Sequence, residues 1–161
     1  PHIKTANQAE SVASSCRYFP EGKRGLSPYT RVHNFSHENL DISLNEANSQ
    51  QLVGILVEGQ EGLTNLEEIA MVEGIDLIYL GLFDISQAVG LPGQLSHPKV
   101  LKEIERCQKV ISSSGKCSGS MSIDLDYIKM LREKNFQFIA YLNDAAALKN
   151  FFDSSINQLN L

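Results

Sequence analysis

The sequence predicts an α/β fold of the TIM-type (β/α) barrel class, with about five of the eight βα units present. Short apolar runs alternate along the chain with longer segments in which apolar and polar residues mix. The runs lie too far apart for hairpins, and this pattern is typical of parallel strands joined by helical crossovers. The expected strands are the apolar runs 1–4, 52–57, 76–80, 117–121 and 136–141.

Segments with helix-start signals follow these runs. Thr and Asp, which are favoured N-cap residues, stand before three of them, and Asp144 begins a last helix. The segment 98–113 has the apolar spacing of a surface helix packed on a sheet, and 38–47 is a further expected helix. The capped helices are expected at 6–16 after Thr5, 65–72 after Thr64 and 125–134 after Asp124.

Length sets the domain organisation that we expect. A closed (β/α)₈ barrel takes about 250 residues, whereas this chain has 161. We therefore expect 1–161 to be a single domain, the C-terminal part of a barrel whose N-terminal units precede Pro1. A doubly wound open sheet is the alternative, but its usual Gly-rich first turn is absent from 4–7. Near-continuous hydrophobicity in the second, third and fifth runs predicts burial on both sheet faces.

Composition argues against several classes of partner. The net charge is −5 and Lys and Arg form no cluster, so nucleic-acid binding is not expected. No apolar stretch approaches the roughly 18 residues of a membrane helix, and we expect a soluble, cytoplasmic protein without a membrane partner. The three cysteines, Cys16, Cys107 and Cys117, lack CxxC spacing and are expected to be reduced. Cys117 has no supporting His motif that would favour a nucleophile.

Two carboxylates stand where barrel enzymes place their chemistry. Glu58 ends the second expected strand, and Asp84 follows the third. Functional residues of parallel barrels cluster at the C-terminal ends of strands, and carboxylates there can bind one hard cation such as Mg²⁺ or Mn²⁺. Spacing alone leaves a structural alternative open, because Asp84 also precedes 85–89 as a helix cap would.

The residues around these carboxylates resemble the HpcH/HpaI aldolase family. The family pattern I-E-x-x-x-A-x-x-N-L-D-E-I is similar to 57–69, and V-x-G-I-D-x-x-x-I-G-P-x-D-L-S is similar to 72–86. Further agreement lies in the R-Y-P-P-x-G-x-R-G-like segment 17–25, in 88–90, in the H-P-E-V-like segment 97–100, and at Gly115-Lys116 and Asn143-Asp144.

The resemblance implies a TIM-type barrel that cleaves or forms a C–C bond at pyruvate, with 2-keto-4-hydroxy acid substrates, through a metal-bound enolate. It implies that Glu58 and Asp84 bind a divalent metal (Mg²⁺, Mn²⁺ or Co²⁺). It also implies that the backbone N–H groups of Phe83 and Asp84 hold the carboxylate of the 2-keto acid, a use of helix-start amides that is physically reasonable. The family forms homo-oligomers by exchanging C-terminal helices, and 145–156 has a suitable apolar stripe, which packing onto its own barrel would explain equally well.

Departures from the family pattern leave other functions open. The family's loop G-P-x-D corresponds to 81–84, where Leu82 replaces the proline and the bulky Phe83 follows it, and Ser27 replaces a glycine. The family's general-base His and carbonyl-orienting Arg belong to early strands, so no catalytic residue is identified here and both are expected upstream. A catalytically inactive relative serving as a binding or assembly module is one alternative, and a citrate-lyase-like acyl-CoA lyase is another. His97 is the one histidine expected in a loop near the catalytic face, and a loop or helix-start role is favoured over that of a base. Arg24 is expected either to bind a phosphate or carboxylate or to form a salt bridge in a loop.

Overall fold

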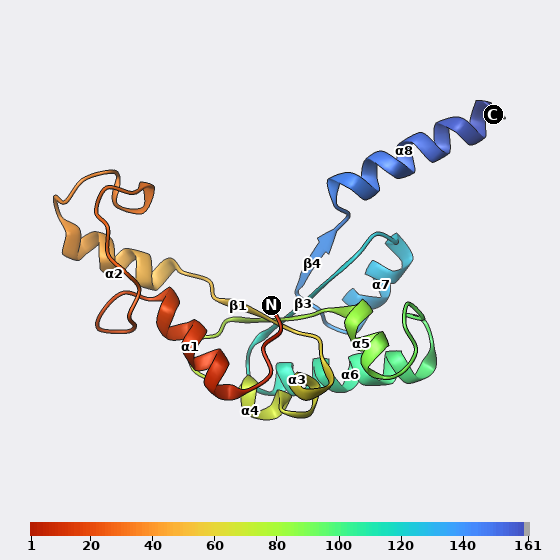
Figure 1. Cartoon of the computed structure of the whole chain (residues 1–161), viewed down its shortest axis with the longest axis horizontal. Coiled ribbons are helices and arrows are strands. Elements are labelled where there is room, and N and C mark those ends of the chain that lie inside the picture. The colour runs from red at the N-terminus through yellow and green to blue at the C-terminus, as the bar shows by residue number, and fades with distance from the viewer. Residues whose placement is uncertain (160–161) are drawn as a thin grey trace.

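The computed structural model describes residues 1–159 (Figure 1). It contains four strands, eight α-helices and one short 3₁₀ helix within that range. In chain order these are α1 Ala6–Cys16, η1 Arg31–His33, α2 Leu40–Gln50, β1 Gly54–Val57, α3 Gln60–Thr64, α4 Leu66–Ala70, β2 Leu77–Leu80, α5 Leu82–Ala88, α6 Pro98–Ser113, β3 Cys117–Ser122, α7 Leu125–Glu133, β4 Phe138–Tyr141 and α8 Asp144–Leu159.

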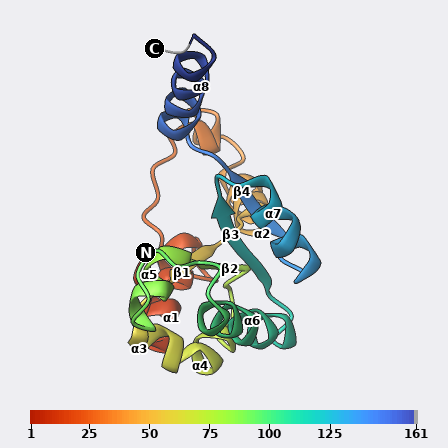
Figure 2. The same ribbon diagram turned by 90° about the vertical axis from the view of Figure 1, so that its right-hand side faces the viewer.

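The strands form one parallel sheet in the order β1-β2-β3-β4. Each strand pairs with the next one along the chain, so the sheet winds in one direction and has no point where the order reverses. Helices α3, α4 and α6 lie together on one side of the sheet, as Figures 1 and 2 show. A sheet wound in sequence order with helices outside is the arrangement of a (β/α) barrel, whereas a doubly wound sheet would reverse its strand order.

The prediction that residues 1–4 form the first strand of the sheet is wrong. Residues 1–4 have no regular secondary structure. The Ile3 N–H does donate a hydrogen bond of 3.0 Å to the Leu56 carbonyl oxygen, so this segment runs beside β1 without forming a ladder. Four of the five expected strands are therefore present among the described residues, at nearly the expected positions.

The two faces of the sheet differ in burial, which corrects the expectation that both are covered. One face carries Val57, Leu80 and Ser120, all fully buried under the helices. The opposite face carries Leu56 and Tyr79, which are only half-buried. β4 has no fully buried residue on either face. The hydrophobic runs therefore indicate strands correctly, but the inner, barrel-side face of the sheet stays partly open in the described chain.

Helix starts follow the sequence in most cases. Thr5 caps α1 by accepting from the Gln8 N–H, and Asp124 caps α7 by accepting from the Tyr127 N–H at 2.8 Å. The cap expected at Thr64 is wrong, because Thr64 is the last residue of α3 and its hydroxyl donates to the Gln60 carbonyl oxygen. The expected helix 65–72 is the short α4 instead, which begins after Asn65.

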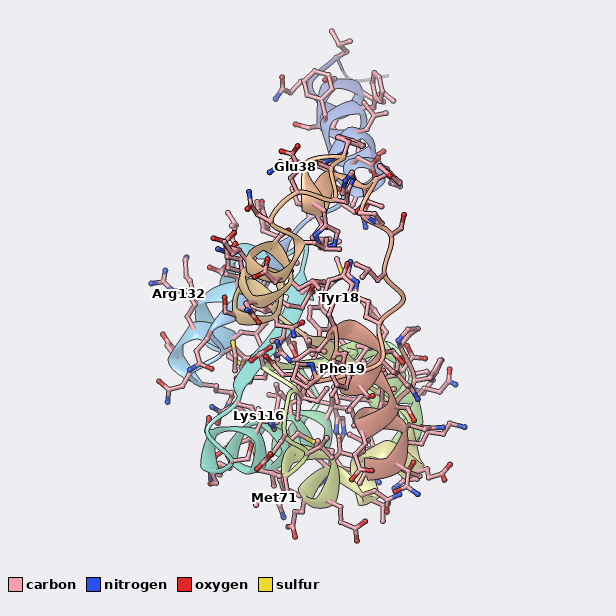
Figure 3. The ribbon with its side chains drawn as sticks, turned by 90° about the vertical axis from the view of Figure 1, so that its left-hand side faces the viewer. Tyr18, Phe19, Glu38, Met71, Lys116 and Arg132 are labelled. Atoms are coloured by element: carbon pink, nitrogen blue, oxygen red, sulfur yellow. The ribbon has the colours of Figure 1, made fainter. Side chains whose placement is uncertain are left out.

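Two segments project from the body of the molecule on opposite sides in Figure 1. One is the connection 17–51, which contains α2 and which we call the arm. Figure 3 shows Tyr18 where the arm leaves α1. The Asn48 side chain holds the backbone of Tyr18 by two hydrogen bonds, accepting from the Tyr18 N–H at 2.8 Å and donating to the Tyr18 carbonyl oxygen at 3.0 Å. The other segment is α8, which has no buried residue. Within 1–159, no helix has the length and apolarity that crossing a bilayer requires.

Candidate metal centre

Glu58 follows β1 directly and lies at the carboxyl end of the sheet. It continues the alternation of Gly54 and Leu56, so its side chain belongs to the inner face of the sheet. The residue is only 6% exposed. Among residues 1–159 its one ion-pair partner is His2, and it accepts no hydrogen bond from the side chains or backbone of those residues. A buried carboxylate with so few partners is available to bind a cation.

Gly81 provides the space that Glu58 occupies. β1 and β2 pair with Val57 opposite Leu80, and the Gly81 N–H donates to the Val57 carbonyl oxygen at 3.3 Å. A Cβ atom at Gly81 would lie 2.4 Å from Glu58 Oε2 and 2.8 Å from Glu58 Cβ. The carboxylate therefore rests on the bare backbone of Gly81, in a cradle that any side chain there would fill.

Asp84 and Phe83 lie in the first turn of α5, the helix that follows β2. Gly81 occupies the N-cap position, so Asp84 is not the helix cap that its spacing allowed. The first intrahelical hydrogen bond runs from the Ile85 N–H to the Gly81 carbonyl oxygen. The N–H groups of Phe83 and Asp84 precede this bond and, as in any first helical turn, lack an intrahelical acceptor. Both side chains are exposed, that of Phe83 to 65%.

The donor set fits a divalent cation in part. Glu58 and Asp84 follow neighbouring parallel strands and offer the oxygen ligands that hard cations prefer. Within the described part of the chain, however, no three His, Cys, Asp or Glu side chains are gathered closely enough to hold a metal ion by themselves. A two-carboxylate site completed by water and substrate remains compatible with this. Joint binding of one metal by Glu58 and Asp84 stays a prediction.

His2 is the residue that sequence reasoning missed. Its Nδ1 atom lies 3.4 Å from Glu58 Oε1, although no motif draws attention to it. The signal was its place in the run 1–4, which lies beside β1. The backbone of His2 has a φ of 56°, in the left-handed region that non-glycine residues rarely adopt.

A cavity of about 790 Å³ opens beside α5 at the same end of the sheet. Phe83 faces it together with Met121 at the end of β3. Its apolar lining also includes residues from α6, α7 and the loop before α6, and acidic and amide groups stand at its edge. Besides Phe83 and Met121, the lining residues that matter are Leu95, Leu101, Ile123, Tyr127, Met130, Asp124 and Asn143.

The other polar residues singled out in the sequence have structural roles. His97 is the N-cap of α6 and its Nδ1 atom accepts from the Lys99 N–H at 3.2 Å. Arg24 lies over the Tyr18 ring at 4.7 Å and donates to Gln51 Oε1 at 3.1 Å. It therefore ties the arm together, and it forms no salt bridge with residues 1–159.

The three cysteines are free thiols, as expected. Burial raises the pKa of Cys117 above its usual value, and burial raises the pKa of Cys107 to about 12. A thiol with a raised pKa carries little thiolate at neutral pH and is a poor nucleophile. The structure therefore favours a packing role for both, as the sequence did for Cys117.

The parallel sheet wound in chain order defines the class of the protein as a parallel α/β barrel protein, and Glu58 marks a candidate site at the carboxyl ends of its strands. Residues 1–150 match the family model for HpcH/HpaI aldolase/citrate lyase. The chain belongs to this family.

Curated relatives agree with the family assignment. A protein of Roseobacter denitrificans named hydroxypyruvate/pyruvate aldolase is 34% identical over 93% of this chain and 58% of its own length. A protein of Salmonella dublin named 2-keto-3-deoxy-L-rhamnonate aldolase is 31% identical over 97% of this chain and 58% of its own length. The chain thus spans little more than half the length of these relatives.

Solved structures agree on the fold. The HpcH/HpaI aldolase of Desulfitobacterium hafniense superposes with a TM-score of 0.91 at 23% identity, over 99% of this chain and 61% of its own. A structure titled citrate synthase SbnG superposes with a TM-score of 0.84 at 26% identity, also over 99% and 61%. The four strands described here are therefore part of a TIM-type barrel fold, which confirms the predicted fold class.

Proposed function

We propose that this chain supplies the metal-binding and keto-acid-binding part of a divalent-metal-dependent aldolase, which cleaves or forms a C–C bond at pyruvate. In this proposal residues 1–161 are the C-terminal part of one (β/α)₈ barrel domain. The observation that carries it is the position of Glu58, buried at the carboxyl end of β1 and cradled on Gly81 beside the start of α5. The names of the relatives supply the substrate class, a 2-keto acid.

In the proposed site Glu58 and Asp84 hold Mg²⁺, Mn²⁺ or Co²⁺. When bound, the metal supplies a Lewis acid for the 2-keto oxygen of the substrate. Burial of Glu58 keeps its carboxylate desolvated, which strengthens its attraction for a cation. Its cradle on Gly81 fixes the direction of the carboxylate, so little side-chain entropy is lost on binding.

The first turn of α5 is the proposed binding place for the substrate carboxylate. The backbone N–H groups of Phe83 and Asp84 donate to it, and their geometry is set by the hydrogen bond from Ile85 to Gly81. The proton acceptor and the carbonyl-orienting Arg are assigned to residues upstream of Pro1. The chain described here thus positions the substrate and the metal and leaves proton transfer to the preceding barrel units.

Retro-aldol cleavage tests the proposal. Purified full-length protein, loaded with Mn²⁺ or Co²⁺, is incubated with a 2-keto-4-hydroxy acid and the release of pyruvate is measured. We expect release that EDTA abolishes and metal restores, and that Glu58→Gln lowers by about 100-fold or more. Glu61→Gln, at an exposed carboxylate on α3, is the matched control. Activity that is unchanged by both EDTA and Glu58→Gln would refute a metal-dependent mechanism.

Two alternatives keep specific support. The bulky, exposed Phe83 in the first turn of α5, where the substrate carboxylate would bind, favours a non-catalytic binding or assembly module. The likeness to citrate synthase SbnG, together with the family description, favours a reaction with citrate, such as that of a citrate-lyase-like acyl-CoA lyase. Including citrate and an acyl-CoA in the same assay separates both from the aldolase. If the protein neither cleaves nor forms any of these acids, the binding or assembly module is the alternative that remains.

Self-association is part of the proposal. Large apolar side chains of α8 are exposed at helical spacing, so this helix has a stripe without a partner among the described residues. A homo-oligomer in which α8 packs on another copy would cover them. The free cysteines fit a reducing compartment, and we place the protein in the cytoplasm. The residues of the stripe are Leu148, Phe151, Phe152, Ile156 and Leu159.

A further inference from the structure

His2 stands beside the carboxylate that the proposed function assigns to the metal. Its segment is fixed against β1 by the hydrogen bond from the Ile3 N–H to the Leu56 carbonyl oxygen at 3.0 Å. This bond places His2 next to Glu58, at the same end of the sheet. The contact is therefore set by the backbone and is not a chance approach of two long side chains.

The distance between the two side chains has a specific meaning. Nδ1 of His2 lies 3.4 Å from Oε1 of Glu58, which is longer than the roughly 2.7–2.9 Å of a charge-assisted hydrogen bond. Two donor atoms bound at about 2.1 Å to one cation lie about 3.0 Å apart at an octahedral angle and about 3.4 Å apart at a tetrahedral angle. The separation thus suits two ligands of one metal ion better than a direct bond.

The backbone of His2 supports the same interpretation. A φ of 56° is unfavourable for a residue with a Cβ atom. Such conformations persist where the surroundings require them, and they cluster at functional sites. An ion pair with one largely exposed partner contributes too little to hold a residue in this region. A metal ligand, in contrast, gains a bond from being held there.

The two side chains differ in exposure. That of Glu58 is 7% exposed and lies within the protein, whereas that of His2, which follows only Pro1 in this sequence, is 63% exposed. Glu58 is therefore the ligand that the described residues hold in place. Asp84 is exposed on α5 and is not gathered with this pair in the structure.

We infer that the imidazole Nδ1 atom of His2 is a ligand of the divalent cation that Glu58 binds. This inference rests on the proposed metal-dependent function and deepens it by naming the metal class. Imidazole favours Co²⁺ and later transition metals, whereas sites made only of carboxylates and water suit Mg²⁺. The protein therefore prefers Co²⁺ to Mg²⁺, and His2 is the residue that produces the preference.

Binding and spectroscopy together test this ligand. His2→Gly removes the imidazole and accommodates a positive φ. We expect it to weaken Co²⁺ binding, measured by titration calorimetry on the full-length protein, by about 10- to 100-fold, and Mg²⁺ binding much less. Pulsed electron paramagnetic resonance of the Mn²⁺-loaded protein should show coupling to a histidine nitrogen, identified by ¹⁵N-histidine labelling. His2→Gly should lose that coupling.

His37→Gly is the matched control, because His37 is an exposed histidine on the arm, and it should keep both affinity and coupling. Wild-type protein that binds metal through Glu58, but shows no nitrogen coupling and no loss of Co²⁺ affinity in His2→Gly, overturns the inference and leaves the proposed function intact. Wild-type protein that binds no divalent metal overturns both.

Discussion

At the scale of single residues, Gly81 decides where the Glu58 carboxylate lies. The side chain of Glu58 crosses the space that a Cβ atom on Gly81 would fill. The two positions are neighbours across β1 and β2, since Val57 pairs with Leu80 just before them. The backbone does not require glycine at position 81, because its φ of −81° is one that any residue can adopt. Glycine is required there because the Glu58 carboxylate occupies the space of a side chain.

Replacing Gly81 with alanine should therefore damage metal binding more than folding. The new Cβ atom would lie 2.4 Å from Glu58 Oε2, so the carboxylate must move out of its cradle. We expect Mn²⁺ affinity, measured by calorimetry, to fall about 10-fold or more. Gly59→Ala is the matched control, since nothing lies within 4 Å of a Cβ atom there. Equal affinities in the two variants would show that the cradle does not matter.

Cys107 gives the free energy of unfolding a pH dependence. Burial raises its pKa from 9.0 to about 12 in the folded state. Between about pH 9 and 12 the unfolded thiol ionises while the folded one stays protonated, so the unfolded state binds fewer protons and stability falls as pH rises. Tyr127, whose pKa burial raises from 10.0 to about 12, acts in the same direction.

Urea unfolding between pH 8 and 11 measures this loss. The free energy of unfolding should decline over that range, and Cys107→Ala should be less stable at pH 8, by about 1–2 kcal/mol for the lost packing, yet decline less steeply. Val100→Ala, a buried packing substitution on the same helix that removes no titratable group, should keep the wild-type slope. A wild-type stability that stays constant up to pH 11 would contradict the account of Cys107.

Sequence reasoning at this scale found the chemistry by motif but not the contacts. The patterns around Glu58 and Asp84 singled out both carboxylates, which lie at the carboxyl end of the sheet as expected. His2 escaped because its role depends on which segment lies beside β1, and no local pattern encodes that neighbour. The cradle at Gly81 escaped for the same reason, since register is fixed by pairing between strands 20 residues apart or more.

At the scale of elements, α8 is a helix that lacks a partner in the described chain. It extends away from the sheet in Figures 1 and 2, and none of its residues is buried. Phe151 and Phe152 are both more than half exposed, and their ring centroids lie 5.7 Å apart. An isolated amphipathic helix of this kind is stable in water mainly when its apolar stripe is covered.

Removing the apolar stripe should dissociate the proposed oligomer. Burying one Phe contributes about 1.5–3 kcal/mol, so Phe151→Ser with Phe152→Ser should weaken association at least 100-fold. Light scattering coupled to size-exclusion chromatography measures the mass of wild type and variant. Gln158→Ser, on the same helix, should leave the mass unchanged. A wild-type protein that is monomeric at every concentration would refute this role of α8.

The sequence predicted most elements because their signals are local. Thr5, Asp124 and the Pro-initiated α6 have cap or start chemistry that the structure repeats. The segment after β1 was predicted less well. Thr64 resembles an N-cap residue, but it is the last residue of α3, so the helix has already formed before it. The chain forms two short helices, α3 and α4, where one helix was expected. Packing against α6, which α4 contacts closely, outweighs the cap preference there.

At the scale of the whole molecule, the winding of the sheet explains why one edge collects the chemistry. Parallel strands paired in chain order bring their carboxyl ends to one rim, so Glu58 after β1 and Asp84 after β2 both lie at this rim despite 26 positions in sequence (84 − 58). The fold class followed from the alternating pattern. The difference in burial between the two faces of the sheet did not, because hydrophobicity alone does not tell which side of a strand the helices cover.

The central claim is that this rim binds one divalent cation through Glu58 and Asp84. Calorimetric titration of the full-length, metal-free protein with Mn²⁺ tests it most directly, on wild type, Glu58→Gln, Asp84→Asn and the control Glu61→Gln. We expect one metal site per chain in wild type and in Glu61→Gln, and loss of that site in Glu58→Gln and in Asp84→Asn. Undiminished binding in both Glu58→Gln and Asp84→Asn, or no binding in wild type, would contradict it.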